Sequence, residues 1–129
     1  MTPAPYYKVR DGAQFAGIHL LVDLQGAQRL DEPAHVAAVL VQAARAAGCT
    51  ILHQHFHHFG PGTGVTGMLL LAESHISIHT WPETGYAAVD VFMCGNCDPH
   101  DALPALRAGF MATDVRVQEF QRGCWPPLS

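Results

Sequence analysis

The residues best suited to chemistry gather in one stretch, LLLAESHISIHTWPETGYAAVDVFMCG, which runs from Leu69 to Gly95. It contains Glu73 followed by Ser74, a histidine five positions later at His79, and a thiol at Cys94. A serine hydroxyl is a weak nucleophile unless a neighbouring base or backbone strain activates it. Because side chains alternate between the two faces of a strand, Ser74 and His79 would face opposite ways in a regular one. The local pattern alone therefore favours a buried serine and a core histidine.

A second group of reactive side chains is the histidine run HQHFHH at 53–58. In a strand His53, His55 and His57 project from the same face, and imidazoles in that arrangement suit a transition metal. No acidic residue or cysteine follows closely enough to complete a metal shell. We therefore interpret the run as one face of a polar pocket or an interface, and we expect no resident metal. A non-enzymatic metal-binding module remains an alternative.

Two further motifs carry weaker signals. Cys94-Gly95-Asn96-Cys97 is a CxxC, but zinc would need a second pair of ligands and thioredoxin-like chemistry would need the motif at a helix start. The stretch GPGTGVTG at 60–67 lacks the Lys-Ser/Thr ending of a phosphate-binding loop, so we interpret it as a flexible rim of a pocket. The cysteines are expected to be reduced thiols, and Cys94 is the one with potential chemistry of its own.

Hydrophobic periodicity predicts the elements that must position these groups. One helix should lie within 31–48, with Asp31 as N-cap, Pro33 in the first turn and Gly48 as the stop. A second helix should run from 98 to 111, provided that Pro104 lies in its first turn. Strands are expected at 15–24, 49–59, 68–80, 86–93 and 114–121, after a loose lead-in at 1–13. The order β-α-β-β-β-α-β predicts an α+β fold, a two-layer sandwich with a mostly antiparallel sheet and two helices on one face.

Composition narrows the function classes. With 129 residues, the chain is expected to form a single domain, 1–129. Hydrophobic residues make up 49% and charged residues 14%, which favours a folded chain. The net charge of −4 provides no basic field for nucleic acid. No apolar run reaches the roughly 20 residues of a membrane span, and the N-terminus has no apolar signal core, so a cytoplasmic protein is expected.

The segment AESHISIHTWPETGYAAVDVFMCG closely resembles the core motif of the S-adenosylmethionine decarboxylase proenzymes, the small prokaryotic type that depends on a pyruvoyl group. A looser likeness extends from Gly17 to Gly123. The resemblance implies that the Ser74 hydroxyl attacks the Glu73 carbonyl and that the resulting ester eliminates. This leaves a dehydroalanine that hydrolyses to the pyruvoyl cofactor. Residues 1–73 would become the β chain and residues 74–129 the α chain.

The resemblance also implies roles for individual residues. His79 would accept the Cα proton of Ser74 during processing, and Thr66 stands where the family usually has a supporting serine. Cys94 would return a proton to the substrate α-carbon after the pyruvoyl ketone has formed a Schiff base with the substrate amine. Residues expected around the substrate are Phe59, Trp81 and Glu83. The family fold also implies a homodimer of processed protomers, with active sites near the subunit boundary.

Several positions depart from the family pattern. The family commonly has arginine at His58, tyrosine at Thr84 and threonine at Met93, and a shorter turn in place of GPGTGVTG. Most of these positions flank the pocket. The residues implied to make the pyruvoyl group therefore match the family pattern, whereas residues expected to select the substrate differ from it. The main prediction is an S-adenosylmethionine decarboxylase that supplies spermidine synthesis. The alternative is the same chemistry acting on L-ornithine or L-arginine.

Overall fold

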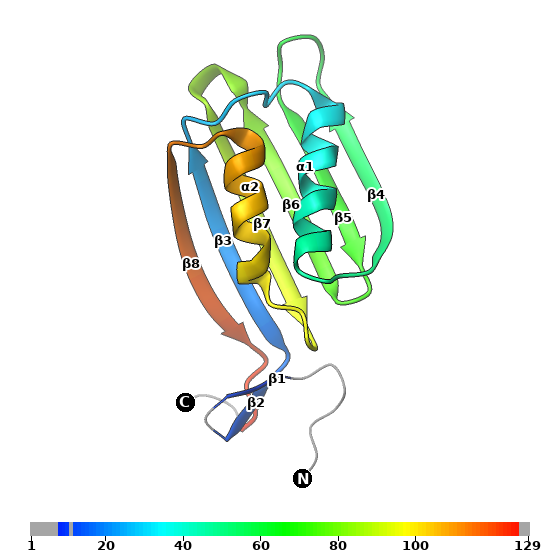
Figure 1. Cartoon of the computed structure of the whole chain (residues 1–129), viewed down its shortest axis with the longest axis vertical. Coiled ribbons are helices and arrows are strands. Elements are labelled where there is room, and N and C mark those ends of the chain that lie inside the picture. Colours follow the sequence, from blue (N-terminus) through cyan, green and yellow to red (C-terminus); the bar gives the residue numbers. More distant parts are fainter. Residues whose placement is uncertain (1–7, 11, 127–129) are drawn as a thin grey trace.

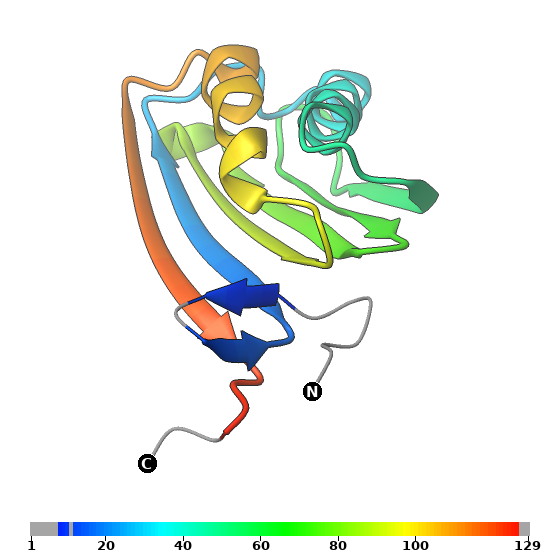
Figure 2. The same ribbon diagram turned by 60° about the horizontal axis from the view of Figure 1, so that its bottom comes forward.

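A six-stranded antiparallel sheet with both helices on one face forms the main body of the protein (Figures 1 and 2). We describe it from a computed structural model covering residues 8–10 and 12–126; the rest of the predicted domain lies outside this description. The strand order is β4-β5-β6-β7-β3-β8. The strands are β3 (Gly17–Gln25), β4 (Ile51–His58), β5 (Val65–Leu71), β6 (Ser74–Trp81), β7 (Tyr86–Cys94) and β8 (Asp114–Arg122), and the helices are α1 (Pro33–Ala46) and α2 (Leu103–Phe110). The predicted α+β sandwich is confirmed.

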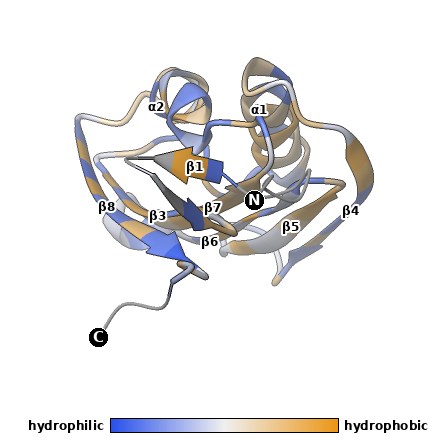
Figure 3. Cartoon of the chain, turned by 90° about the horizontal axis from the view of Figure 1, so that it is seen from below, coloured by the Kyte–Doolittle hydropathy of each residue, from blue (hydrophilic) through white to orange (hydrophobic). Residues whose placement is uncertain are grey.

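The hydrophobic core lies between the sheet and the two helices. Alternate residues of each central strand face the helices, and Figure 3 shows the resulting alternation of hydrophobic and hydrophilic segments along the strands. The strand residues buried there include Leu20, Leu24, Leu69, Ile76, Ile78, Val91 and Met93, packed against Val36, Leu40, Leu106 and Phe110 of the helices. In the described part of the chain, no helix is long and apolar enough to cross a membrane.

The helix ends follow from proline, glycine and a local ion pair. Helix α1 begins at Pro33, whose fixed φ suits the first helical position, and this makes Glu32 the N-cap instead of the predicted Asp31. Glu32 makes no side-chain capping bond. The Arg29 guanidinium holds its carboxylate at 3.0 and 2.9 Å instead. Gly48, at φ +75°, follows the helix as predicted.

The second helix and the chain's lead-in also differ in detail from the prediction. Pro104 lies in the first turn of α2, as required, and a 3-10 turn η2 (Pro99–Ala102) precedes that helix. Part of the predicted lead-in forms a short hairpin from β1 (Lys8–Arg10) and β2 (Ala13–Phe15); residues 1–7 and 11 lie outside the described chain.

The single strand predicted at 68–80 is two strands joined by a tight turn. Strand β5 starts at Val65, inside the glycine-rich segment, and ends at Leu71; β6 then starts at Ser74. Only Ala72 and Glu73 separate the paired residues Leu71 and Ser74. Neither is a typical turn residue, and apolar residues continue on both sides, so the sequence carries no turn signal. The Glu73–Ser74 bond therefore joins a turn to a strand.

Candidate active site at the Glu73–Ser74 turn

Ser74 has an unusual backbone conformation. Its φ is +140°, in a region that residues with a side chain rarely adopt. Holding a non-glycine residue in such a region costs on the order of 1–3 kcal/mol and persists only where the surrounding structure enforces it. Here the enforcing contacts are the ladder pairs to Leu71 on β5 and Met93 on β7. The bond expected to break therefore adjoins a strained residue.

The Glu73 carbonyl oxygen accepts two hydrogen bonds from one residue, Cys94. The Cys94 backbone N–H donates at 2.9 Å and its Sγ donates at 3.1 Å. The Ser74 Oγ also lies 3.9 Å from the Cys94 Sγ. Two donors on a carbonyl oxygen can stabilise the negative charge that forms there when a nucleophile attacks the carbon. Sequence reasoning missed this contact because it depends on the register between β6 and β7.

The turn is anchored on its other side to the residues that precede β4. The Thr50 backbone N–H donates to the Glu73 carboxylate at 2.9 Å, and the Thr50 carbonyl accepts from the Ala72 N–H at 2.9 Å. Both the backbone and the side chain of the turn are thereby fixed. The geometry around the Glu73 carbonyl is preorganised instead of depending on a mobile loop.

His79 lies away from Ser74 within one chain. Strand β6 pairs with β7 without a register break from Ser74 to Trp81, so the spacing of five residues places the Cα atoms of Ser74 and His79 about 16 Å apart. His79 is instead paired with Thr66 of β5, whose Oγ1 lies 3.1 Å from the His79 Nδ1. The structure thus brings the predicted histidine and its predicted supporting hydroxyl together, but not with the serine.

The remaining predicted residues surround a hollow beside His79, at the far end of β6. It has a volume of about 460 Å³ and is lined by Phe59, Gly62, Thr63, Gly64, Thr66, His79, Thr80, Trp81 and Glu83. Trp81 stacks on Tyr86, with ring centroids 5.3 Å apart. A hydrogen bond to the Asp23 carboxylate, together with burial, raises the pKa of Tyr86 to about 12, so this phenol stays protonated. Sequence reasoning did not single out Tyr86. The predicted site therefore forms two groups, one at each end of β6.

Comparison with known proteins places the chain in a family. The family model for S-adenosylmethionine decarboxylase matches residues 18–123. The chain belongs to the S-adenosylmethionine decarboxylase family. An S-adenosylmethionine decarboxylase proenzyme of Acidithiobacillus ferrooxidans (strain ATCC 53993 / BNL-5-31) is 54% identical over 68% of this chain and 66% of its own length, just under two thirds. One from Methanococcus vannielii is 46% identical over 83% of this chain and 89% of its own.

A solved structure supports the same membership. The adenosylmethionine decarboxylase of Aquifex aeolicus VF5 is 38% identical, with a TM-score of 0.75, over 83% of this chain and 90% of that chain. The predicted family is confirmed, and membership of the S-adenosylmethionine decarboxylase family favours an enzyme over a metal-binding module. At two places among the described residues, the ligand atoms of three side chains that could bind a metal lie within 4.8 Å of one another. Neither place includes His53, His55 or His57.

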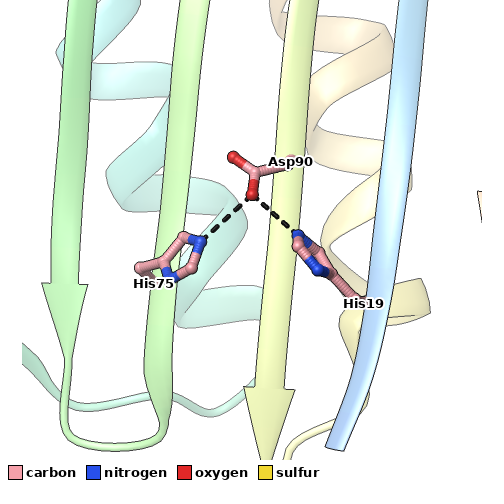
Figure 4. Close-up of side chains that lie close together, drawn as sticks. All are labelled: His19, His75 and Asp90. Carbon is pink, nitrogen blue, oxygen red and sulfur yellow. Dashed lines mark hydrogen bonds and ion pairs between the residues drawn. The ribbon is translucent and has the colours of Figure 1, made fainter. Parts of the chain in front are cut away.

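In this S-adenosylmethionine decarboxylase family member, a carboxylate with two histidines lies on the sheet face that no helix covers (Figure 4). One oxygen of Asp90 lies 2.7 Å from His19 Nε2 and 3.1 Å from His75 Nε2, while the Ser77 hydroxyl donates to the other oxygen. Arg122 lies 3.1 Å from His19 Nδ1. Burial alone would raise the pKa of Asp90, but the hydrogen bonds from His75 and His19 outweigh it and lower the pKa below its ordinary value. No local pattern in the sequence indicates this cluster, because its members come from three strands, β3, β6 and β7.

Asp90→Asn should destabilise the fold in a pH-dependent way. A carboxyl whose pKa is lower in the folded protein stabilises the fold at pH values above its unfolded pKa of about 3.8. This stabilisation is lost as the pH falls through the lower pKa of the folded state. At pH 7 we expect a loss of about 1–2 kcal/mol in the free energy of unfolding, shrinking below about pH 4. Urea unfolding midpoints, determined at a fixed protein concentration, measure this loss of stability. Substitution of an exposed carboxyl, Asp114→Asn, is the control. An equal loss at pH 7 and pH 3 would contradict the assignment.

Proposed function

We propose that the protein is an S-adenosylmethionine decarboxylase that makes its pyruvoyl cofactor from its own Ser74 and serves spermidine synthesis in the cytoplasm. The observation that carries the proposal is the Glu73 carbonyl, held by both donors of Cys94 beside a strained Ser74. The relatives described above are all decarboxylases of S-adenosylmethionine by name, which favours this substrate over ornithine or arginine.

Self-cleavage begins with the Ser74 hydroxyl. Its oxygen bonds to the Glu73 carbonyl carbon while the Cys94 N–H and S–H stabilise the carbonyl oxygen. The C–N bond then breaks, which leaves an ester between Glu73 and the Ser74 oxygen and a free amine on Ser74. Removal of the Ser74 Cα proton expels the Glu73 carboxylate. Water hydrolyses the resulting enamine to a ketone and ammonia. Release of the strain at φ +140° favours the forward direction.

The residues around Ser74 fit the group that this reaction makes. A pyruvoyl group supplies a ketone that condenses with an amine and an adjacent carbonyl that draws electrons as carbon dioxide leaves. The Cys94 thiol, 3.9 Å from the Ser74 oxygen, stands where it can donate a proton to the substrate α-carbon. A protonated thiol is acidic enough to serve as this donor.

A homodimer would reunite the two halves of the site. Ser74 and Cys94 lie at one end of β6, and the hollow beside His79 lies at the other. In a twofold dimer each contact occurs twice, so packing two sheets face to face with opposite strand directions places the serine end of one protomer against the hollow of the other. Two equivalent sites result. In each, the partner subunit's His79 takes the proton from Ser74.

The uncovered face of the sheet has the character of such an interface. It carries exposed large apolar side chains that would be costly to leave in water, namely Leu21, Met68, Leu70 and Phe120, which are 42%, 41%, 47% and 48% exposed. The cluster of His19, His75 and Asp90 lies among them. A second copy of the chain would cover both the apolar residues and the polar cluster.

Within this dimer the hollow would receive the substrate's nucleoside end. Phe59 and Trp81 offer aromatic faces, which stack on an adenine and attract a sulfonium cation. The Glu83 carboxylate can accept hydrogen bonds from ribose hydroxyls. A basic amino acid has no ring to place in the hollow, so this lining favours S-adenosylmethionine as the substrate.

Denaturing mass spectrometry should find two fragments, 1–73 and 74–129, with a blocked N-terminus on the second. Ser74→Ala should remain one chain and release no carbon dioxide, because the attacking oxygen is gone. Ser77→Ala is the matched control, since it removes a hydroxyl from the same strand. An uncleaved wild-type chain, or a cleaved Ser74→Ala chain, would refute the proposed origin of the cofactor.

The substrate is tested by measuring carbon dioxide release from S-adenosylmethionine, L-ornithine and L-arginine, each supplied alone to the cleaved protein. We expect release from S-adenosylmethionine, with Trp81→Ala raising its KM because an aromatic face of the hollow is lost. Turnover of an amino acid without turnover of S-adenosylmethionine would establish the alternative instead.

A further inference from the structure

Two thiols with no part in the proposed chemistry lie beside the cleavage turn. The Sγ atoms of Cys49 and Cys97 and one carboxylate oxygen of Glu73 all lie within 4.8 Å of one another. Cys49 precedes β4 and is partly exposed, whereas Cys97 follows β7 and is buried, with 6% of its surface exposed. Residues distant in the sequence thus bring two soft sulfur ligands and one oxygen ligand together at a single point.

The surroundings hold these groups in place. The Thr50 N–H fixes the Glu73 carboxylate from one side, and the carboxylate keeps further lone pairs for a second partner. Cys49 Sγ lies 3.6 Å from the Met93 Sδ. A cation that replaces the thiol protons would gain a site whose ligand positions are already formed.

We infer that Cys49, Cys97 and Glu73 bind a thiophilic divalent cation of the Zn²⁺ class. In a tetrahedral site with Zn–S bonds of about 2.3 Å, two sulfur ligands lie about 3.8 Å apart, which is compatible with ligand atoms that all lie within 4.8 Å of one another. Binding releases the two thiol protons, and the two thiolates and the carboxylate then surround the cation. Water takes the fourth position, which is the open coordination of a three-ligand site.

The other group of ligand-type side chains, His19, His75 and Asp90, lacks these properties. Its carboxylate oxygens already accept three hydrogen bonds. The Arg122 guanidinium next to His19 Nδ1 places a positive charge beside the cluster and fixes the His19 proton on Nε2, which faces Asp90. A cation would have to displace these satisfied hydrogen bonds. The cysteine group is therefore the metal site of the two.

The position of the site has a consequence that rests on the proposed cleavage. Cys49 and Glu73 belong to fragment 1–73, whereas Cys97 belongs to fragment 74–129. A bound cation would therefore tie the two fragments together across the cut. It would also hold the new carboxyl-terminal residue, Glu73, next to the pyruvoyl end.

The test uses the uncleaved Ser74→Ala chain, so that it does not depend on the proposed function. One equivalent of Co²⁺ should give the intense near-ultraviolet charge-transfer absorption of two thiolate ligands, and Zn²⁺ should abolish it by displacement. In the same background, Cys49→Ser and Cys97→Ser should each weaken Zn²⁺ binding at least about 100-fold. Cys124→Ser and His19→Ala should bind as the parent does, because neither removes a proposed ligand.

The Co²⁺ spectrum of the Ser74→Ala chain, the parent of these variants, tests the inference even if a cysteine variant does not fold. Absence of thiolate–cobalt absorption in the reduced parent chain would overturn the inference. So would Zn²⁺ affinity that is unchanged in a folded Cys49→Ser or Cys97→Ser chain, or that is lost in His19→Ala. A Cys49–Cys97 disulfide that persists under reductant and prevents binding would show that the pair is a redox site and would equally overturn it.

Discussion

Chains carrying Ser74→Ala and chains carrying His79→Ala should each fail to cleave alone, yet cleavage should return when the two are co-expressed. In one chain His79 lies about 16 Å from Ser74 along the same strand, so it cannot take the Ser74 Cα proton there. In a mixed dimer, one of the two sites combines an intact Ser74 with the intact His79 of the partner subunit. The other site carries both substitutions and stays inactive.

The expected product distribution is specific. Random association makes half of the dimers mixed, and one chain in each mixed dimer is cut, so about a quarter of all chains should be cleaved. All cut chains should be His79→Ala chains, because only these retain the serine. Mass spectrometry distinguishes them when one variant carries a tag.

The matched control pairs His79→Ala with the double variant Ser74→Ala/His79→Ala. This mixture contains intact Ser74 but no intact histidine, and it should stay uncleaved. If the mixture of single variants also stayed uncleaved while gel filtration showed mixed dimers, the site would not be shared between subunits. Normal cleavage of His79→Ala alone would remove the histidine from the processing step.

The sequence allowed the elements to be predicted where their signals are local. Helix α1 follows from a period of 3.6 residues ending at Gly48, and the central strands follow from alternation. The same alternation predicted that Ser74 and His79 would face apart in a regular strand, but the positive φ of Ser74 makes the strand irregular at that point. The turn at Ala72 and Glu73 was missed because no glycine, proline or asparagine marks it.

The chemistry of the site depends on register, which a single sequence does not display. The resemblance alone implied the proton-donor role of Cys94, and its two contacts with the Glu73 carbonyl arise only because β7 lies beside β6 in one particular alignment. The approach of Cys49 to Cys97 likewise depends on how the ends of distant elements meet. Long-range contacts of this kind leave no periodic trace in the chain.

Cys94→Ala should separate two functions of one thiol. In self-cleavage the Sγ is one of two donors to the Glu73 oxygen, and the backbone N–H at 2.9 Å survives the substitution. We therefore expect cleavage to slow about 10-fold and still reach completion. In decarboxylation the thiol is the only proton donor we assign, so carbon dioxide release per cleaved chain should fall about 100- to 10,000-fold.

Cys94→Ser sharpens the test because it restores one function and not the other. A hydroxyl can donate to the Glu73 oxygen, so cleavage should return close to the wild-type rate. A serine hydroxyl is a far weaker acid than a thiol, so decarboxylation should stay low. Time courses of cleavage by mass spectrometry, and carbon dioxide release per mole of cleaved protein, measure the two steps separately. A wild-type rate of decarboxylation in Cys94→Ala would refute the proton-donor role. A wild-type rate of cleavage in Cys94→Ala would show that the backbone N–H alone stabilises the charge on the Glu73 oxygen.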